Sequence, residues 1–317
     1  MIEILEKYIK VVRKSSEEMK SVGCNKIHIG LRGAFNLTSN LTLIYLIVLQ
    51  LFFAACTEDE IITLDPPAGE PIPQNATDSI ILEMRHKYQT NIIYRWDRRY
   101  TSSDAKVSPV KFELVKPYLQ IIQDFWINPF DDQVHGFMRN HIPVEIILVG
   151  STIRYHEGEE QGFNAAGQAI SYSRILLAGV NDYNMADTFW LAQQIITMQH
   201  EFAHTLDKKY GRPKGFDDIS EGLYAGNTSF TQFTQETARE RGFWIPYGMS
   251  NEAEDFATIV EAFIELPKSE LLDEIGGNKL LKEKYDKVNN YYLSLGIDLH
   301  EVQKSIDDIL NLTSGSY

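Results

Sequence analysis

The feature that most constrains the fold is a pair of histidines, His200 and His204, in the segment TFWLAQQIITMQHEFAHTLDKKYG. Apolar side chains recur at helical spacing along this segment, and Gly211 at its end is a typical helix stop. Residues four apart on an α-helix lie one turn apart on the same face. The sequence therefore predicts a buried helix that presents two imidazoles side by side.

Two imidazoles at this spacing can bind one metal ion, and zinc accepts histidine nitrogens at about 2.0–2.1 Å. Glu201 directly follows the first histidine. Its side chain projects to one side of the pair, where it can reach a water on the ion without joining the ligands. Two ligands with a neighbouring glutamate base are the arrangement that a metallopeptidase needs. The alternative interpretation is an ordinary helix with two incidental histidines.

A catalytic zinc site uses three protein ligands and leaves the fourth position to water. No histidine occurs between His204 and His300, so we expect the third ligand to be a carboxylate. We expect His300 itself to be a surface residue of the C-terminal helices. The remaining histidines that lack a partner at metal spacing are expected to have no metal role: His135, His141 and His156.

The segment FWIPYGMSNEAEDFATIVEAFIEL, residues 243–266, is the best source of that carboxylate. Ser250 or Asn251 can cap a helix that carries Glu252 and Glu254 in its first turn. Either glutamate is a candidate ligand, the first by analogy with the thermolysin-type Asn-Glu pattern. For Asp207, in the last turn of the preceding helix, we expect a surface position rather than a metal role.

The stretch YGMSNEAEDFA resembles the zinc-binding metallopeptidases found among Bacteroidetes lipoproteins. It is also similar to the stretch that carries the third ligand in the catalytic domain of anthrax lethal factor. The resemblance is specific over residues 199–263. It implies that Glu254 is the third ligand of a single zinc ion and that Tyr247 donates its hydroxyl to the developing oxyanion.

One position departs from the family pattern, which tends to place another glutamate four residues after the ligand as an outer-shell partner. This sequence has Thr258 there. A threonine hydroxyl can hydrogen-bond a ligand but supplies no charge, so metal affinity or ligand orientation is expected to differ. Glu261, a further turn along, is an alternative for this role that we do not favour.

Strand-like and helix-like patterns follow one another along the chain. The apolar runs VEIILVGS (144–151) and RILLAGV (174–180) predict strands. Upstream, an amphipathic helix interrupted near Pro117 is expected. From about residue 187 the pattern is helical to the end. We therefore predict an α+β, zincin-like body, with a sheet-containing part at 80–185 and a helical part at 186–317 that holds the metal site.

The glycine-rich stretch HEGEEQGFNAAGQ, residues 156–168, lies between the two predicted strands and predicts a loop. One of the two strands is expected to offer an edge to which an extended substrate adds.

The N-terminal part carries the run LTLIYLIVLQLFFAA at residues 41–55, which has no charged side chain and suits the apolar core of a signal peptide. Cys56 follows small residues, as in the bacterial lipobox, where the cysteine is lipidated. The run CTEDE resembles the acidic export signal of Bacteroidetes surface lipoproteins. The alternative is a buried helix that ends at a cysteine. Because the apolar run begins late, we expect translation to start after Met1, with Met19 as the candidate.

These features predict a signal peptide region at 1–55, a lipidated, proline-rich tether at 56–79 and a zinc metallopeptidase domain at 80–317. Cys24 and Cys56 are the only cysteines, so a disulfide framework is excluded in the mature chain. We expect a bacterial lipoprotein of the outer membrane, exposed at the cell surface, whose membrane contact is made through the lipid anchor alone.

The net charge of −14 argues against a nucleic-acid partner, because phosphate contacts need clustered Lys and Arg. The sequence predicts a zinc-dependent peptide hydrolase with Glu201 as the general base and a peptide or protein as the substrate. The alternative is a non-catalytic surface lipoprotein, associated with nutrient or glycan binding, that retains a zinc site.

Overall fold

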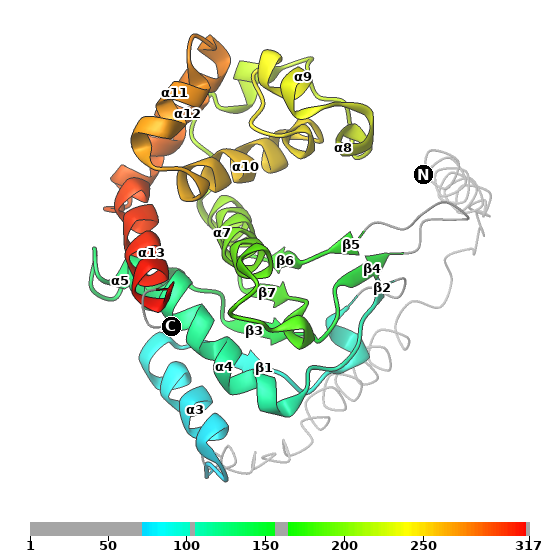
Figure 1. Ribbon diagram of the computed structural model, residues 1–317, viewed down its shortest axis with the longest axis vertical. Coiled ribbons are helices and arrows are strands. Elements are labelled where there is room, and N and C mark those ends of the chain that lie inside the picture. The colour runs from blue at the N-terminus through cyan, green and yellow to red at the C-terminus, as the bar shows by residue number, and fades with distance from the viewer. Residues whose placement is uncertain (1–71, 102–104, 156–163, 315–317) are drawn as a thin grey trace, which may run out of the picture. The chain divides into compact units, whose positions relative to one another are not determined.

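The computed structural model describes residues 72–101, 105–155 and 164–314 (Figure 1). The expected signal peptide region, the lipidation site Cys56 and the start of the tether lie outside the described residues and stay predictions, as does the expectation for His156. In the described ranges, no helix combines the length and the apolar character that a bilayer span requires.

Within the described ranges, a four-stranded sheet has the order β1-β3-β7-β6. The strands β1 (Asn91–Ile93), β3 (Glu145–Leu148) and β7 (Arg174–Leu177) are parallel, and β6 (Gly167–Ser171) pairs with β7 in the antiparallel direction at the sheet edge. Apolar residues follow one another along β3 and β7 because both faces of these central strands are buried. Both predicted strands are thus confirmed.

The two faces of this sheet are covered differently. A smaller sheet of β2 (Ala105–Lys106), β4 (Ile153–Tyr155) and β5 (Asn164–Ala165) covers one face, where Ile147 and Leu176 are buried. Ile146 and Ile175, which alternate with them, belong to the main core on the other face. The N-terminal helices pack there: α3 (Ala76–Tyr88), α4 (Phe112–Ile122) with a π-helical extension η2 (Gln123–Ile127), α5 (Asn128–Asp131) and α6 (Phe137–His141).

The expected interruption near Pro117 is wrong, because α4 continues through this residue. Proline lacks only its own N–H, so one intrahelical hydrogen bond is lost. Val115, Tyr118 and Leu119 around it are fully buried and hold the helix against the core.

The C-terminal half is helical, as predicted. The longest helix among the described residues, α7 (Thr188–Tyr210), begins at Asp187, whose carboxylate accepts hydrogen bonds from the N–H groups of Phe189 and Trp190. In α10 (Glu252–Glu265), Asn251 is the cap. The other helices and short 3₁₀ segments after α7 are η4 (Asp217–Ser220), α8 (Ser229–Gln232), α9 (Gln235–Glu240), η5 (Pro246–Met249), α11 (Lys268–Ile275), α12 (Lys279–Ser294) and α13 (Leu299–Ser314).

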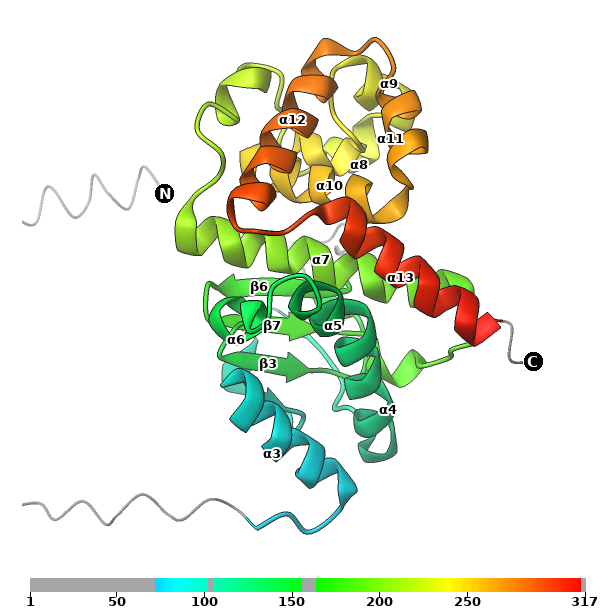
Figure 2. The same ribbon diagram turned by 90° about the vertical axis from the view of Figure 1, so that its left-hand side faces the viewer.

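Helix α7 lies between the sheet and the C-terminal helices, with β6 and β7 on one side and α10 on the other (Figures 1 and 2). Phe202 of α7 is fully buried, and its ring meets those of Trp126 and Phe130 edge-on. Burial of a side chain of this size stabilises the fold by about 1.5–3 kcal/mol. The helix with the two histidines is therefore fixed on both sides.

The expectation for His300 is wrong. Its side chain is buried, its Nε2 lies 2.8 Å from the Tyr285 hydroxyl, and its ring packs on Phe263. The apolar spacing of α13 placed this residue on the buried face of the helix rather than on the surface.

Candidate metal and catalytic site

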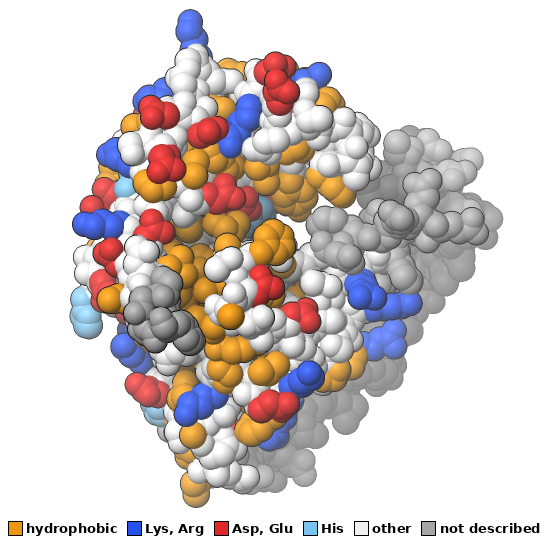
Figure 3. Space-filling model, in the orientation of Figure 1, with side chains coloured by type: hydrophobic (Ala, Val, Ile, Leu, Met, Phe, Trp, Pro, Cys, Tyr) orange, Lys and Arg blue, Asp and Glu red, His pale blue; other side chains and the backbone are white. Residues whose placement is uncertain are grey.

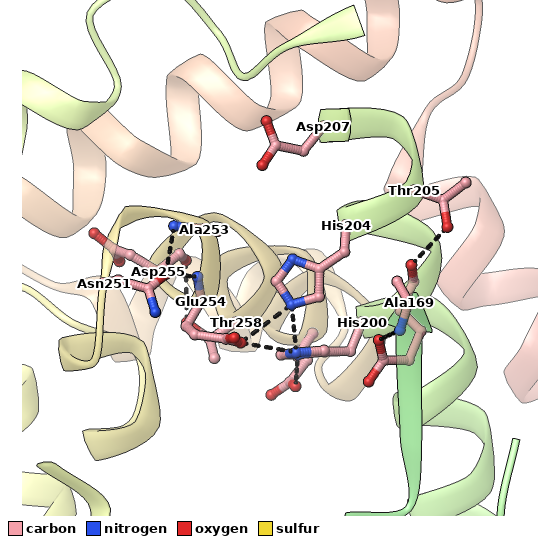
Figure 4. Close-up of polar contacts among 12 residues, drawn as sticks. Ala169, His200, His204, Thr205, Asp207, Asn251, Ala253, Glu254, Asp255 and Thr258 are labelled. Carbon is pink, nitrogen blue, oxygen red and sulfur yellow. Dashed lines mark hydrogen bonds and ion pairs between the residues drawn. The ribbon is translucent and has the colours of Figure 1, made fainter. Parts of the chain in front are cut away.

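Two side chains of α7 and one of α10 converge between the helices (Figure 4). The Nε2 atoms of His200 and His204 are 3.0 Å apart, and Oε2 of Glu254 lies 3.1 Å from each of them. Local structure fixes this arrangement, because the histidines are one helical turn apart on α7. The side chain of Asn251 accepts a hydrogen bond from the backbone N–H of Glu254 and so caps the first turn of α10. The structure thus brings the three predicted ligands together.

The donor atoms fit a single small cation. A tetrahedral zinc site with bonds of about 2.0–2.1 Å separates its ligand atoms by about 3.3 Å. The separations of 3.0 and 3.1 Å in this cluster are within a few tenths of an ångström of that value. Among the described residues, these three side chains are the group of His, Cys, Asp or Glu that could hold a metal ion.

The cluster is electrostatically suited to a positive charge. Burial lowers the pKa of His200, but the carboxylates of Glu261 and Glu254 outweigh burial and raise this pKa well above its ordinary value. For Glu254, burial raises the pKa, yet the two histidines bring it far below its usual range. The carboxylates thus favour a positive charge in the cluster, which either a proton on His200 or a metal cation can supply.

Glu261 is the partner of His200 on the side away from the cluster. Its Oε1 lies 2.5 Å from Nδ1 of His200. A proton on Nδ1 leaves the lone pair of Nε2 free for a metal ion, and an outer carboxylate of this kind also raises ligand basicity. Glu261, the alternative that we did not favour, is therefore the residue in the outer position. Its spacing of seven residues from Glu254, two helical turns, was the signal.

Thr258 does not occupy the outer-shell position that the family pattern suggests. Its hydroxyl donates to the backbone carbonyl of Asp255 at 3.0 Å. It also lies against Gly248, where a Cβ atom would come within 2.6 Å of the hydroxyl oxygen. The residue packs the start of α10 against the preceding segment.

Glu201 is held beside the cluster by strand β6. Its Oε2 accepts a hydrogen bond from the N–H of Ala169 at 2.5 Å. Gly167 lets the strand approach α7 this closely, because a Cβ atom there would lie 2.6 Å from Cγ2 of Thr197 and 3.0 Å from Cγ of Glu201. The side chain expected to act as a base is thus oriented by a backbone donor.

Strand β6 was missed by the sequence interpretation, which placed its first two residues, Gly167 and Gln168, in the loop at 156–168. The expectation that one of the two predicted strands offers an edge to the substrate is also wrong, because β3 and β7 lie inside the sheet. The edge next to the candidate metal-binding cluster is formed by β6. The sequence of β6, GQAIS, has Ile170 as its single β-branched residue, so the local signal for a strand was weak.

A cavity of about 520 Å³ opens over the cluster and is lined by residues of β6, α7 and α10. Figure 3 shows the molecule hollowed on this side, with acidic side chains near the hollow. Tyr247 of η5 also lines the cavity, and its ring centroid lies 6.0 Å from that of His200. Burial, followed by the charge of Glu254, raises the pKa of Tyr247, so its hydroxyl keeps its proton and remains a donor.

The other candidates stay outside the cluster. Glu252 is half-buried and does not belong to it. Asp207 is not a surface residue as expected: its side chain is largely buried and ion-paired with Arg212, although it binds no member of the cluster. His135 is exposed, and His141 stacks on Phe137 instead.

Comparison with known proteins gives a consistent result. A family model described as "Putative zinc-binding metallo-peptidase" matches residues 71–300. Among solved structures, the fold is similar to the crystal structure of a protein from Bacteroides caccae with the same description, at a TM-score of 0.58 and 23% identity, covering 75% of this chain and 93% of that chain. No protein of curated function matches. The likeness to anthrax lethal factor stays a prediction.

Proposed function

Because the chain belongs to the family described as "Putative zinc-binding metallo-peptidase", we propose that it is a zinc-dependent peptide hydrolase. The observation that carries the proposal is the convergence of His200, His204 and Glu254 beside a positioned Glu201 in an open cavity. These three side chains would hold one zinc ion. When bound, zinc lowers the pKa of a water toward about 7 and polarises a carbonyl group.

Glu201 acts as the general base. One of its carboxylate oxygens is engaged by the N–H of Ala169, which fixes the orientation of the carboxylate. The other oxygen takes a proton from the attacking water, and the carboxyl group then delivers that proton to the leaving amine. Tyr247 donates its hydroxyl to the oxygen of the scissile carbonyl as negative charge develops there.

The substrate lies beside β6. This strand forms one wall of the cavity and the edge of its sheet, and an extended peptide binds to such an edge through its main chain. A third histidine or a cysteine that would close a structural zinc site as the fourth ligand is absent from the residues lining the cavity in the described part of the chain. This supports catalysis over a purely structural metal role.

Replacement of Glu201 by Gln tests the mechanism. The amide cannot take a proton, so we expect peptide cleavage to fall by about 10²–10⁴-fold while zinc remains bound. Bound zinc is measured by atomic emission and turnover with a broad peptide library. Glu236→Gln, the same change at an exposed position of α9, is the control. Turnover that persists in Glu201→Gln would remove the mechanism, and zinc without any cleavage by the native protein would favour the non-catalytic surface-binding lipoprotein.

We also propose that the chain is a lipoprotein anchored through Cys56 and exposed at the outer membrane surface. Support comes from the uncharged run at 41–55, the small residues before the cysteine and the acidic CTEDE run after it. Metabolic labelling with a fatty-acid probe tests the anchor. The label should be lost in Cys56→Ala and kept in Cys24→Ala, and labelling of both variants alike would refute it.

A further inference from the structure

The backbone of Ala169 in β6 binds two side chains of helix α7. Its N–H donates to Glu201, and its carbonyl oxygen accepts a hydrogen bond from Nζ of Lys208. Lys208 follows Glu201 by seven residues, two helical turns, so both side chains leave α7 on the side that faces β6. Within the described residues, Lys208 is the only lysine or arginine that lines the cavity.

This ammonium group has no carboxylate partner in the described ranges, and its one hydrogen bond leaves two of its donors available. The neighbouring Asp207 does not compensate its charge, because that carboxylate is paired with Arg212, which also binds Asp217. The other acids of the cavity are engaged as well: Glu201 by Ala169, Glu254 by the two histidines, and Glu261 by His200. Among the described residues, Lys208 is thus the positive charge of the cavity that lacks a carboxylate partner, while the acidic side chains named above each have a partner.

The distance between the Lys208 ammonium group and the proposed general base can be bounded, because both bind Ala169. Glu201 and Lys208 bind the N–H and the C=O of one residue, and one residue spans at most about 3.3–3.6 Å. The ammonium group therefore lies about one to two residue lengths from the proposed general base. An extended peptide beside β6 would bring to Lys208 a group within about two residues of its scissile bond.

We propose that Lys208 binds a carboxylate of the substrate, so that the enzyme prefers peptides with an acidic group within two residues of the cleaved bond. This inference rests on the proposed peptidase function and deepens it. The carboxylate belongs either to an Asp or Glu side chain or to the C-terminus of the peptide, since both present the same charged acceptor. An ammonium group beside the cleavage position recognises either one.

Matched peptides test the proposal on the zinc-loaded protein. Each pair differs only by Glu or Gln at one of the two positions on either side of the cleaved bond, with the C-terminus amidated. A second set lacks acidic side chains and carries either a free or an amidated C-terminus. We expect kcat/KM to be about ten- to a hundredfold higher for the charged member at one position, because hydrogen bonds to charged groups are the stronger ones. Which set shows the preference identifies the source of the carboxylate.

Variants assign the preference to Lys208. In Lys208→Gln the Glu-to-Gln ratio should approach one, and in Lys208→Glu a Lys-containing peptide should become the better substrate. Lys209→Gln is the matched control, since this adjacent lysine binds the carbonyl of Asn140 and does not line the cavity. Its Glu-to-Gln ratio should equal that of the native protein.

The outcomes separate this inference from the proposed function. Cleavage of charged and neutral peptides with equal kcat/KM, or a preference that survives in Lys208→Gln, overturns the inference and leaves the peptidase intact. If no peptide is cleaved, the proposed function fails. The binding of the same peptides, measured by fluorescence anisotropy, then decides the role of Lys208: charged peptides must bind more tightly to the native protein than to Lys208→Gln, and equal binding overturns it.

Discussion

Oε1 of Glu261 lies 2.5 Å from Nδ1 of His200 and so joins the second half of α10 to the face of α7 that carries the two proposed histidine ligands. Through this contact one acidic side chain selects the tautomer of a proposed ligand and adds negative charge behind it. The same helix thus supplies both a proposed ligand, Glu254, and the support for another.

Replacement of Glu261 by Gln should weaken zinc binding by about 10–100-fold, because the amide keeps the size of the side chain but removes its charge. Competition with a fluorescent chelator measures the affinity. Glu265→Gln is the matched control: this residue is one turn further along α10 and only accepts a hydrogen bond from the indole N–H of Trp244. Equal zinc affinity in both variants would contradict the role of Glu261.

The identity of the third ligand can be tested by comparing the zinc affinities of variants at two glutamates of the same helical turn. Glu254→Ala should reduce zinc affinity by more than the roughly 100-fold expected for an outer-shell partner. Glu252→Ala should bind zinc like the native protein, because its side chain is outside the cluster. Isothermal titration of zinc into the metal-free variants gives both values. The reverse ranking would assign the ligand to Glu252.

Gly167→Ala should separate β6 from α7. The new methyl group would meet Thr197 at 2.6 Å and Glu201 at 3.0 Å, and such overpacking costs about 1–3 kcal/mol of stability. We expect lower kcat as well, since the shift disturbs the hydrogen bond between Ala169 and Glu201. Urea unfolding and peptide turnover measure the two effects. Gly277→Ala, where no atom lies within 4 Å of a new Cβ, should change stability by less than about 0.5 kcal/mol; a similar loss there would refute the steric explanation.

The buried ion pair between Lys284 and Asp255 gives a pH-dependent prediction. Nζ of Lys284 lies 2.7 and 2.9 Å from the carboxylate oxygens, and neither side chain is exposed. Burial is the main cause that raises the pKa of Asp255 and lowers that of Lys284. Lys284→Met should destabilise the fold by about 3–5 kcal/mol near pH 8, because it leaves a buried carboxylate without its partner.

The loss should be smaller near pH 5. A carboxyl group whose folded pKa is above its unfolded value of about 3.9 binds a proton more readily in the folded state, so stability falls as the pH rises above that value. Urea unfolding from pH 5 to 8 shows the trend. Lys282→Met, which removes an exposed pair with Asp286 on the same helix, should cost less than about 0.5 kcal/mol at every pH. A loss in Lys284→Met that is independent of pH would argue against a buried, ionised Asp255.

Much of the helical framework could be predicted from local patterns. The period of apolar residues in α7 and the capping side chains Asp187 and Asn251 fix where the two helices of the site begin. The pair of histidines follows from helical spacing alone. The assignment of Glu254 over Glu252 needed the family resemblance, because both lie in the same turn.

The rest of the site depends on contacts between residues distant in sequence. Strand β6, with the sequence GQAIS, has a single β-branched residue, Ile170, and its pairing with β7 and its contact with Glu201 define it instead. Lys208 belongs to the site only because Ala169 lies opposite it. Helical spacing made Glu261 visible in the sequence, but its partner His200 is 61 residues away.

The proposed ligands come from α7 and α10, two helices separated by more than forty residues of chain. An ion shared between them acts as a removable cross-link, and its contribution to folding grows with the logarithm of its free concentration. Metal scarcity would then increase the unfolded, protease-sensitive fraction of the protein as well as lower its proposed catalytic output. Zinc supply would set how much enzyme persists, and not only how much of it is active.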